Sequence, residues 1–343
     1  MSKHKLTFSE NLPTNQIKRL DYIDALKGFV ILLVVMGHVL ACNYPDFREA
    51  LASNAQGMML WKIIYSFYMP LFMFCSGFVF HKSKDFFSTR NSFTLIFKRF
   101  KGLMIPYISM GFISFLLIDK FFIYWYLYCL FVFYIITNII EWIMFRFKCW
   151  TICVDSLFLL VTSFIFMLLR GKLSQFEELP LIDLEHFSLY FYFILGIVIR
   201  RHNLHNVVQS RNIFFSISIV LFFGLTLAKF QGILFPLSSV VYLLISLSAI
   251  SCLLFFFQAN ECKGKIFSLL QKCGNYTLEI YVLHVFFYVS IPWGALDSLP
   301  CRMSFVLQLV TSLLSSVVII AICFVIINFI SKSDLLKRIL FGK

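Results

Sequence analysis

Long apolar runs separated by short polar segments fill almost the whole chain, and most runs have the length of a membrane-spanning helix. Such a helix needs about 20 predominantly apolar residues to cross the hydrocarbon layer. On that basis the pattern predicts ten spanning helices, of which the sixth is short: 25–43, 58–80, 102–118, 121–145, 151–169, 187–200, 213–230, 233–257, 276–294 and 303–330.

The segments between these helices are too short to fold on their own. The two longest, 81–101 and 170–186, are each about 20 residues long, well below the size of an independent domain. We therefore expect a single all-α integral membrane domain over residues 1–343, in which 1–24 is an N-terminal segment and 331–343 is a tail. Any chemistry must then use groups within the helices or just above them.

Composition excludes the other broad classes of protein. Apolar residues make up 60% of the chain and charged residues 14%, whereas a soluble domain has about 45–50% and 25%. Soluble, fibrous and disordered chains are therefore excluded. The 10 cysteines lie mostly inside the apolar runs and form no Cys-x-x-Cys pair, so we expect no metal site.

Lysine and arginine are distributed unevenly between the two sets of connecting segments. If the N-terminus lies in the cytoplasm, 23 of the 30 Lys and Arg fall in inside segments and 6 in outside segments. Cytoplasmic segments of membrane proteins carry such an excess, so the split predicts that both termini are cytoplasmic. The net charge of +13 is then a topology signal, and nucleic-acid binding is not expected.

The first predicted helix carries two ionisable residues on one face at different depths. Lys27 lies at the cytoplasmic mouth, and His38 follows eleven residues later, about 16 Å deeper along the helix axis. Eleven residues at 100° each return to within about 20° of the same face. An imidazole near mid-membrane suits general-base catalysis, although a hydrogen bond to a neighbouring helix is its common structural role.

The ninth predicted helix places a second histidine at a similar depth. His284 lies about 15 Å beyond Gly274, so the two imidazoles are at matching levels and can face one cavity. Glu279 lies little more than one turn before His284, near the inner mouth. This carboxylate either takes part in the chemistry or forms an ion pair with a neighbouring Lys or Arg.

The second predicted helix contains Pro70, which should kink it, and the small pair Ser76 and Gly77. A serine nucleophile is conceivable at Ser76. Small residues in membrane helices more often allow two backbones to approach closely, so the pair favours helix packing.

Basic and aromatic residues lie at the two faces of the predicted bundle. The inner segment 81–101 ends with Lys98, Arg99 and Lys101, which either hold an anionic ligand or enforce topology. Trp125 and Tyr126 lie near the outer face, where aromatic rings stack on sugars or anchor the helix at the interface.

Several of these segments follow one another in the order of a known family. The relevant positions are Arg19, Asp24, Leu26, Gly28, Gly37, His38, the Met69–Gly77 stretch, Arg99, Leu103, Pro106, Tyr107, Trp125, Tyr126 and the Gly274–His284 stretch. Together they resemble the acyltransferase family 3 of integral membrane acyltransferases, and in particular its fucose-4-O-acetylase-like branch. Ten helices is also that family's number. Lys27 departs from the family's usual arginine, keeping the charge but losing the bidentate fork.

This resemblance implies an activity and a set of roles. Members move an acyl group, usually acetyl, from cytoplasmic acetyl-CoA to a hydroxyl of a cell-surface glycan or its lipid-linked precursor. They are multi-pass proteins of the cell inner membrane and need no metal. By the same resemblance His38 either is the base that takes the proton of the acceptor hydroxyl or relays the acyl group, and His284 is a further catalytic candidate. Glu279 remains a catalytic candidate beside its ion-pair alternative, and Trp125 and Tyr126 either contact the sugar or anchor the helix. The coenzyme A phosphates would be bound by the basic residues Lys27, Lys98, Arg99 and Lys101.

A transporter or flippase for a polysaccharide or small anion is the alternative function. Buried His and Glu residues serve proton relays as well as catalysis. An inverted repeat would favour transport, and none is evident in the sequence. The sugar, its hydroxyl, the acyl length and the oligomeric state do not follow from the sequence.

Overall fold

The computed structural model describes residues 20–42, 58–80, 89–119, 124–146, 152–173, 184–204, 212–230, 238–259, 264–287, 295 and 298–343. Every regular element in these ranges is a helix, which confirms the all-α prediction. In chain order they are α1 (Asp21–Cys42), α3 (Met59–Tyr65), α4 (Tyr68–Val79), α5 (Thr89–Ile118), α6 (Trp125–Arg146), α7 (Ile152–Leu173), η3 (Leu184–Leu189), α8 (Tyr190–Arg201), α10 (Asn212–Phe230), α11 (Ser238–Ala259), α12 (Lys265–Asn275), α13 (Thr277–Leu283), η5 (His284–Phe287), α14 (Cys301–Ile330) and α15 (Asp334–Phe341).

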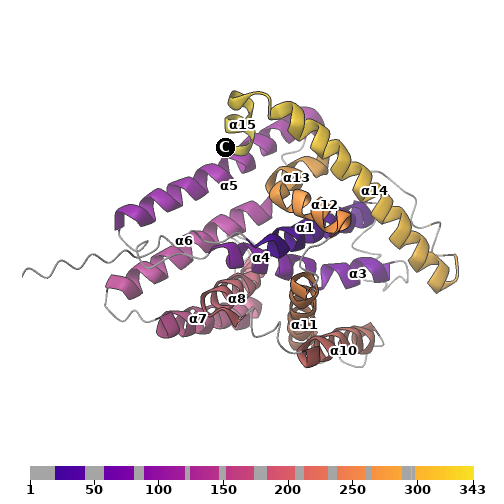
Figure 1. The fold of residues 1–343 in the computed structure, drawn as a ribbon, viewed down its shortest axis with the longest axis horizontal. Helices are drawn as coiled ribbons and strands as arrows, with labels where there is room; N and C mark the ends of the chain where they lie inside the picture. Colours follow the sequence, from indigo (N-terminus) through magenta and orange to yellow (C-terminus); the bar gives the residue numbers. More distant parts are fainter. Residues whose placement is uncertain are drawn as a thin grey trace, which may run out of the picture.

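Helices α1 and α4 lie at the centre of the arrangement (Figure 1). Helix α1 packs against α4, α11, α12, α13 and α14, and nearly every side chain of α4 is buried. The long α14 runs along one edge, where Val325 is 70% and Phe329 68% exposed. Apolar side chains exposed around a buried centre are what a lipid-facing surface requires, because lipid is as apolar as the side chains.

Six of the described helical stretches are long and apolar enough to cross a membrane, and three shorter apolar helices accompany them. The chain is therefore a multi-pass membrane protein. Each of the ten predicted segments overlaps one or two described helices. That all ten cross the membrane, and that both ends are cytoplasmic, stay predictions.

The predicted inner segments contain helices that the apolar pattern missed. Treating all of 81–101 as a loop is wrong, because α5 already begins at Thr89. Basic residues are excluded from lipid but not from helices, so the α5 helix continues past the end of its apolar part. Two short amphipathic helices, α12 and α15, likewise lie within the predicted inner segments 258–275 and 331–343.

The second predicted span is interrupted close to its proline. Helix α3 ends at Tyr65 and α4 begins at Tyr68, with a turn at Ser66 and Phe67 between them. The ring of a proline clashes with the carbonyl four residues earlier, which for Pro70 is that of Ser66. The expected kink is therefore a break between two helices.

Glycines set the closest helix contacts around α1 and α4. A Cβ on Gly77 of α4 would lie 1.8 Å from the carbonyl oxygen of Phe193 in α8, and one on Gly196 would lie 2.2 Å from that of Phe74. Helix α1 meets α12 in the same way, through Gly28 and Gly274. The prediction that Gly77 allows close helix packing is confirmed.

We expect Gly77→Ala to destabilise the fold, because its methyl group would overlap the Phe193 backbone, which has no side-chain freedom to move aside. Overpacking of this kind typically costs about 1–3 kcal/mol. The matched control is Gly224→Ala in α10, where no heavy atom lies within 4 Å of the added Cβ. Thermal unfolding in detergent should show a lower midpoint for Gly77→Ala alone. Equal midpoints for the two variants would contradict the close contact.

Candidate functional site

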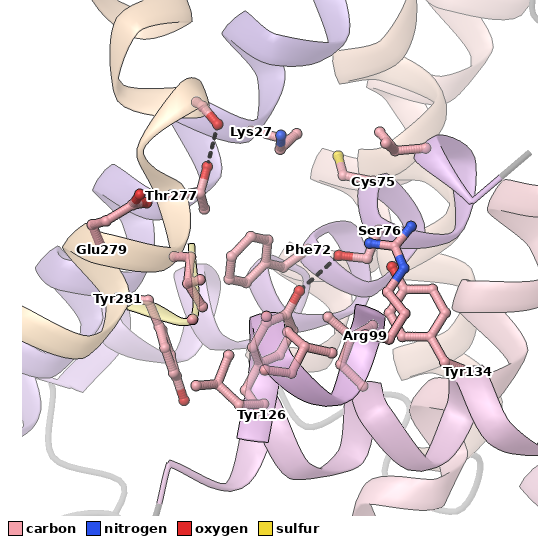
Figure 2. Close-up of a pocket in the computed structure, with 18 of the residues that line it drawn as sticks. Lys27, Phe72, Cys75, Ser76, Arg99, Tyr126, Tyr134, Thr277, Glu279 and Tyr281 are labelled. Atoms are coloured by element: carbon pink, nitrogen blue, oxygen red, sulfur yellow. Dashed lines mark hydrogen bonds between the residues drawn. The ribbon is translucent and has the colours of Figure 1, made fainter. Parts of the chain in front are cut away.

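A cavity of about 470 Å³ lies where α1, α4, α5, α6 and the α12–α13 junction meet (Figure 2). This volume falls within the range of small-molecule sites, about 300–1,000 Å³. Its wall consists of Lys27, Phe72, Cys75, Ser76, Val79, Lys98, Arg99, Gly102, Leu103, Tyr126, Leu127, Leu130, Tyr134, Gly274, Asn275, Thr277, Leu278, Glu279, Tyr281, Gly342 and Lys343. Five of the residues predicted for the site, Lys27, Lys98, Arg99, Tyr126 and Glu279, thus share one cavity.

The cavity wall is cationic. Among the described residues of the wall, Lys27, Lys98, Arg99 and Lys343 are basic and Glu279 alone is acidic, so these side chains carry a formal charge of +3 (four minus one). The carboxylate of the buried Glu279 accepts a hydrogen bond from Lys343. The ion-pair alternative for Glu279 is therefore what the structure shows. A catalytic role for this carboxylate stays a prediction.

Two polar contacts fix the cavity wall on its α4–α6 side. The guanidinium of Arg99 lies over the ring of Tyr134, 4.4 Å from its centroid. The hydroxyls of Ser76 and Tyr126 are hydrogen-bonded at 2.7 Å, as Figure 2 shows. Ser76 thus has a polar partner across the cavity, whereas its neighbour Gly77 makes the close contact with α8.

The two predicted histidines lie together behind the floor of this cavity. The rings of His38 and His284 are 5.3 Å apart, centroid to centroid, although they come from α1 and η5. Tyr281 separates them from the cavity, with its ring 5.9 Å from His284 and 5.3 Å from Tyr126. The rings of Tyr126, Tyr281 and His284 therefore form a row from the cationic cavity to the histidine pair.

The two histidines differ in their exposure and contacts. His284 is fully buried, and its Nδ1 lies 3.1 Å from the carbonyl oxygen of Ile280. A carbonyl only accepts, so in the neutral ring Nδ1 carries the proton and Nε2 carries the lone pair. His38 keeps partial exposure. Of the two rings, His38 is therefore the more exposed.

The other predicted residues fall outside this cavity. Lys101 is exposed, and its ammonium lies 4.6 Å from the centre of the Phe97 ring. Trp125 lines a second cavity and stacks on His186 with ring centroids 3.9 Å apart. Successive residues of a helix point about 100° apart, which is why Trp125 and Tyr126 face different cavities.

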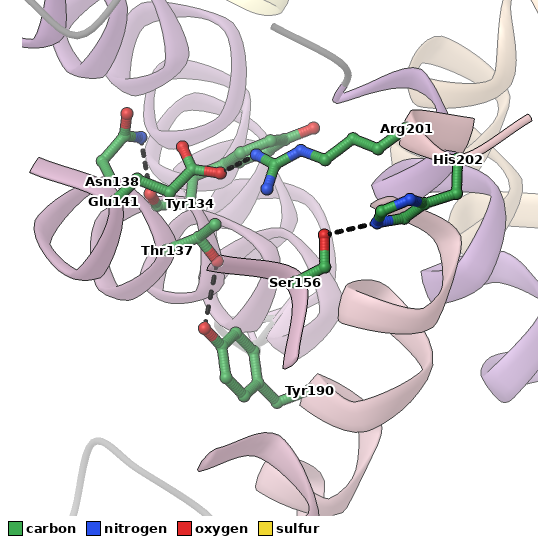
Figure 3. A network of polar contacts seen from close by, with 8 residues as sticks. All are labelled: Tyr134, Thr137, Asn138, Glu141, Ser156, Tyr190, Arg201 and His202. Atoms are coloured by element: carbon green, nitrogen blue, oxygen red, sulfur yellow. Dashed lines mark hydrogen bonds and ion pairs between the residues drawn. The ribbon is translucent and has the colours of Figure 1, made fainter. Parts of the chain in front are cut away.

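Behind Tyr134, a buried polar network joins α6 to α7 and α8 (Figure 3). Arg201 of α8 donates to the carboxylate of Glu141 on α6, and both side chains are buried. The hydroxyls of Thr137 and Tyr190 lie 3.1 Å apart. Because Tyr134 belongs to the same helix, this network fixes the part of α6 on which Arg99 rests.

Reasoning from the sequence did not find Tyr134, Lys343 or His186. No spacing rule brings Lys343 to Glu279, which lies 64 residues away. Tyr281 was within reach, because it lies inside the Gly274–His284 stretch that carries the family resemblance. Among the residues that the structure describes, no three His, Cys, Asp or Glu side chains gather into a metal-binding group.

Comparison with known proteins gives one finding. The model of a family described as an acyltransferase domain, acyltransferase family 3, matches residues 20–328. The match runs from the start of α1 almost to the end of α14 and so includes both histidines and most of the cavity wall. Neither the curated proteins nor the solved structures contain a match.

Proposed function

Because the chain belongs to acyltransferase family 3, and is therefore a membrane acyltransferase, we propose that it transfers acetyl groups from cytoplasmic acetyl-CoA. The acceptor is a hydroxyl of a cell-surface glycan or of its lipid-linked precursor, and the membrane is the cell inner membrane. The observation that supports this proposal is that Tyr281, which lines the cationic cavity, also contacts His284 of the histidine pair.

The cavity suits the donor. Coenzyme A carries phosphates, and the basic side chains of the wall favour such an anion, although Lys343 pairs with Glu279 and Lys27 lies 3.5 Å from Asp24. Arg99, held over Tyr134, offers a planar fork of donors, whereas Lys27 offers a point charge. Lys101 lies outside the wall, so its proposed contact is with phosphates beyond the mouth.

His38 performs the proton transfer in this scheme. Its ring takes the proton of the acceptor hydroxyl while that oxygen attacks the thioester carbonyl carbon. The tetrahedral intermediate collapses, the carbon–sulfur bond breaks, and the departing thiolate takes the proton from His38. The products are an acetyl ester and free coenzyme A, with no other reactant required.

His284 orients the base. Its Nδ1–H is held by the Ile280 carbonyl, which leaves Nε2 as the acceptor on a ring 5.3 Å from that of His38. A proton on His38 shared with that nitrogen, directly or through one water, fixes the tautomer of His38. Glu279 is assigned to holding Lys343 at the cavity rather than to a proton transfer.

We expect Lys27→Ala to raise the KM for acetyl-CoA about tenfold with little change in kcat, because it removes a phosphate contact made before and during the reaction. Lys27→Arg should restore most of the function, since it keeps the charge and adds the fork. Steady-state kinetics in acetyl-CoA provide the measurement.

Lys272→Ala is the matched control for that experiment. Lys272 lies on α12 near the Phe324 ring and lines no part of the cavity, so its removal should leave the KM for acetyl-CoA unchanged. An unaltered KM for acetyl-CoA in well-expressed Lys27→Ala would contradict the phosphate contact. Lys27 would then be an interfacial lysine whose side chain extends toward water.

The proposed topology has its own test. Reporter-domain fusions should place residues 81–101 inside and 170–186 outside, because the first segment holds six Lys and Arg and the second two, with four carboxylates. Finding both segments on one side would break the ten-span topology and remove the depth argument for His38.

The activity itself is tested with the purified protein in lipid nanodiscs. Acetyl-CoA and a crude fraction of cell-surface and lipid-linked glycans are added, and free thiol and new acetyl esters are measured together. We expect thiol release that depends on the glycan fraction and equals the ester formed. In sealed proteoliposomes, movement of glycan across the bilayer without thiol release would favour a transporter.

A further inference from the structure

A second cavity, of about 300 Å³, lies among α3, α4, α6, η3, α8 and α11. Four kinds of side chain dominate its wall: tryptophan, tyrosine, histidine and serine. Trp125 and His186 stack on each other at 3.9 Å and form one side. No Asp, Glu, Lys or Arg lines this cavity within the described ranges.

The hydroxyls of this wall are oriented to accept hydrogen bonds. Ser246 directs its single hydrogen at backbone carbonyls, at 2.8 Å from Tyr242 and 3.0 Å from Leu243. Its oxygen also lies 2.6 Å from the Tyr192 hydroxyl, in a hydrogen bond in which either group can be the donor. Ser66 likewise donates to the Ile63 carbonyl at 2.7 Å and keeps its own lone pairs.

A wall of aromatic faces and acceptor oxygens matches a polyol. Sugar rings present apolar C–H faces to aromatic side chains and donate several hydroxyl hydrogens, whereas a lipid acyl chain offers no donors. The volume lies at the lower end for ligand sites, about 300 Å³, which suits one ring rather than an oligosaccharide.

The two cavities lie on either side of a thin partition. Trp125 lines the second cavity and Tyr126 the first, with ring centroids 6.3 Å apart. On α4 the change occurs between Pro70, which faces the second cavity, and Phe72, which faces the first. A ligand in the second cavity is thus separated from the proposed donor cavity by about one layer of side chains.

We propose that the second cavity binds a sugar ring of the acceptor against the Trp125–His186 stack. This inference rests on the proposed function, since it places the acceptor opposite the acetyl-CoA cavity. His186, Tyr192 and Ser246 thereby become binding residues, and Trp125 contacts the sugar while Tyr126 belongs to the donor side.

Binding is tested separately from catalysis by saturation-transfer NMR on the protein in nanodiscs. The probes are methyl glycosides of glucose, galactose, fucose, rhamnose and N-acetylglucosamine. We expect the wild type to give contact signals from the ring protons of at least one probe. Trp125→Ala should weaken that binding about tenfold, and Trp125→Phe should retain most of it because an aromatic face remains.

Trp142→Ala is the matched control, since Trp142 is exposed on α6 and lines neither cavity. It should bind the probe as the wild type does. Kinetics add a second readout: Trp125→Ala should raise the KM for the glycan acceptor and leave that for acetyl-CoA unchanged. Absence of wild-type binding to every probe, or equal binding by Trp125→Ala, overturns the proposal.

The outcomes also distinguish the sugar site from the proposed function. Sugar contact that depends on Trp125, in a protein that releases no thiol from acetyl-CoA, supports the cavity and refutes the acetyl transfer. If thiol release and ester formation are unchanged in Trp125→Ala, the sugar site in the second cavity is refuted, whereas the proposed acetyltransferase activity is supported.

Discussion

His38→Ala is expected to lower acetyl transfer at least 100-fold while the protein still inserts and folds. The substitution removes the base and adds no charge to the membrane interior, and base catalysis typically contributes about 10²–10⁴-fold. In the proposed scheme His38 is the proton acceptor beside the buried His284, with the two rings 5.3 Å apart, so the substitution removes that acceptor. Ester formation per mole of folded protein is the measurement.

The control for that result is the same substitution at another histidine. His202 lies at the end of α8, where its Nε2 is 2.9 Å from the Ser156 hydroxyl, and it has no role in the proposed proton transfer. His202→Ala should keep near-normal activity. If His38→Ala retained more than about a tenth of wild-type activity, His38 would not be the base.

Arg201→Ala is expected to destabilise the protein by about 3–5 kcal/mol, because it leaves the Glu141 carboxylate buried without this ion pair. The measurement is chemical unfolding in detergent, followed by intrinsic fluorescence. The effect on activity should be secondary, since this network holds the helix that carries Tyr134 and makes no contact with the first cavity itself.

Removing both charges distinguishes the stabilisation by the ion pair from the cost of burying one charge without its partner. A Glu141→Leu/Arg201→Leu variant should recover most of the lost stability, because a well-packed apolar pair often replaces a buried ion pair at little cost. A double variant as unstable as Arg201→Ala would show that the ion pair itself stabilises the contact between α6 and α8.

The depth of a residue along a helix, and the face of the helix on which it lies, could be predicted from the sequence. The level of His38 relative to that of His284 follows from a fixed rise per residue, and the structure places these rings 5.3 Å apart. Lys27 also lies on the side of α1 that faces α13, as the angle between residues 27 and 38 requires. The all-helical fold followed equally from the apolar runs.

Features that depend on neighbouring helices could not be predicted in this way. The separation of Trp125 from Tyr126 into two cavities depends on which helices pack against each side of α6. The ion pair of Glu279 requires a lysine brought in by the last residues of the chain. The start of α5 at Thr89 was missed because hydropathy reports contact with lipid rather than helix formation.

The most direct test of the account separates donor and acceptor by a bilayer. Proteoliposomes are selected for molecules whose reporter-tagged segment 81–101 faces outward, the glycan fraction is trapped inside, and radiolabelled acetyl-CoA is added outside. We predict labelled acetyl esters inside the vesicles, at least 100-fold fewer with His38→Ala. Esters that form only when acetyl-CoA and glycan share a compartment would contradict transfer from the cationic cavity through the histidine pair.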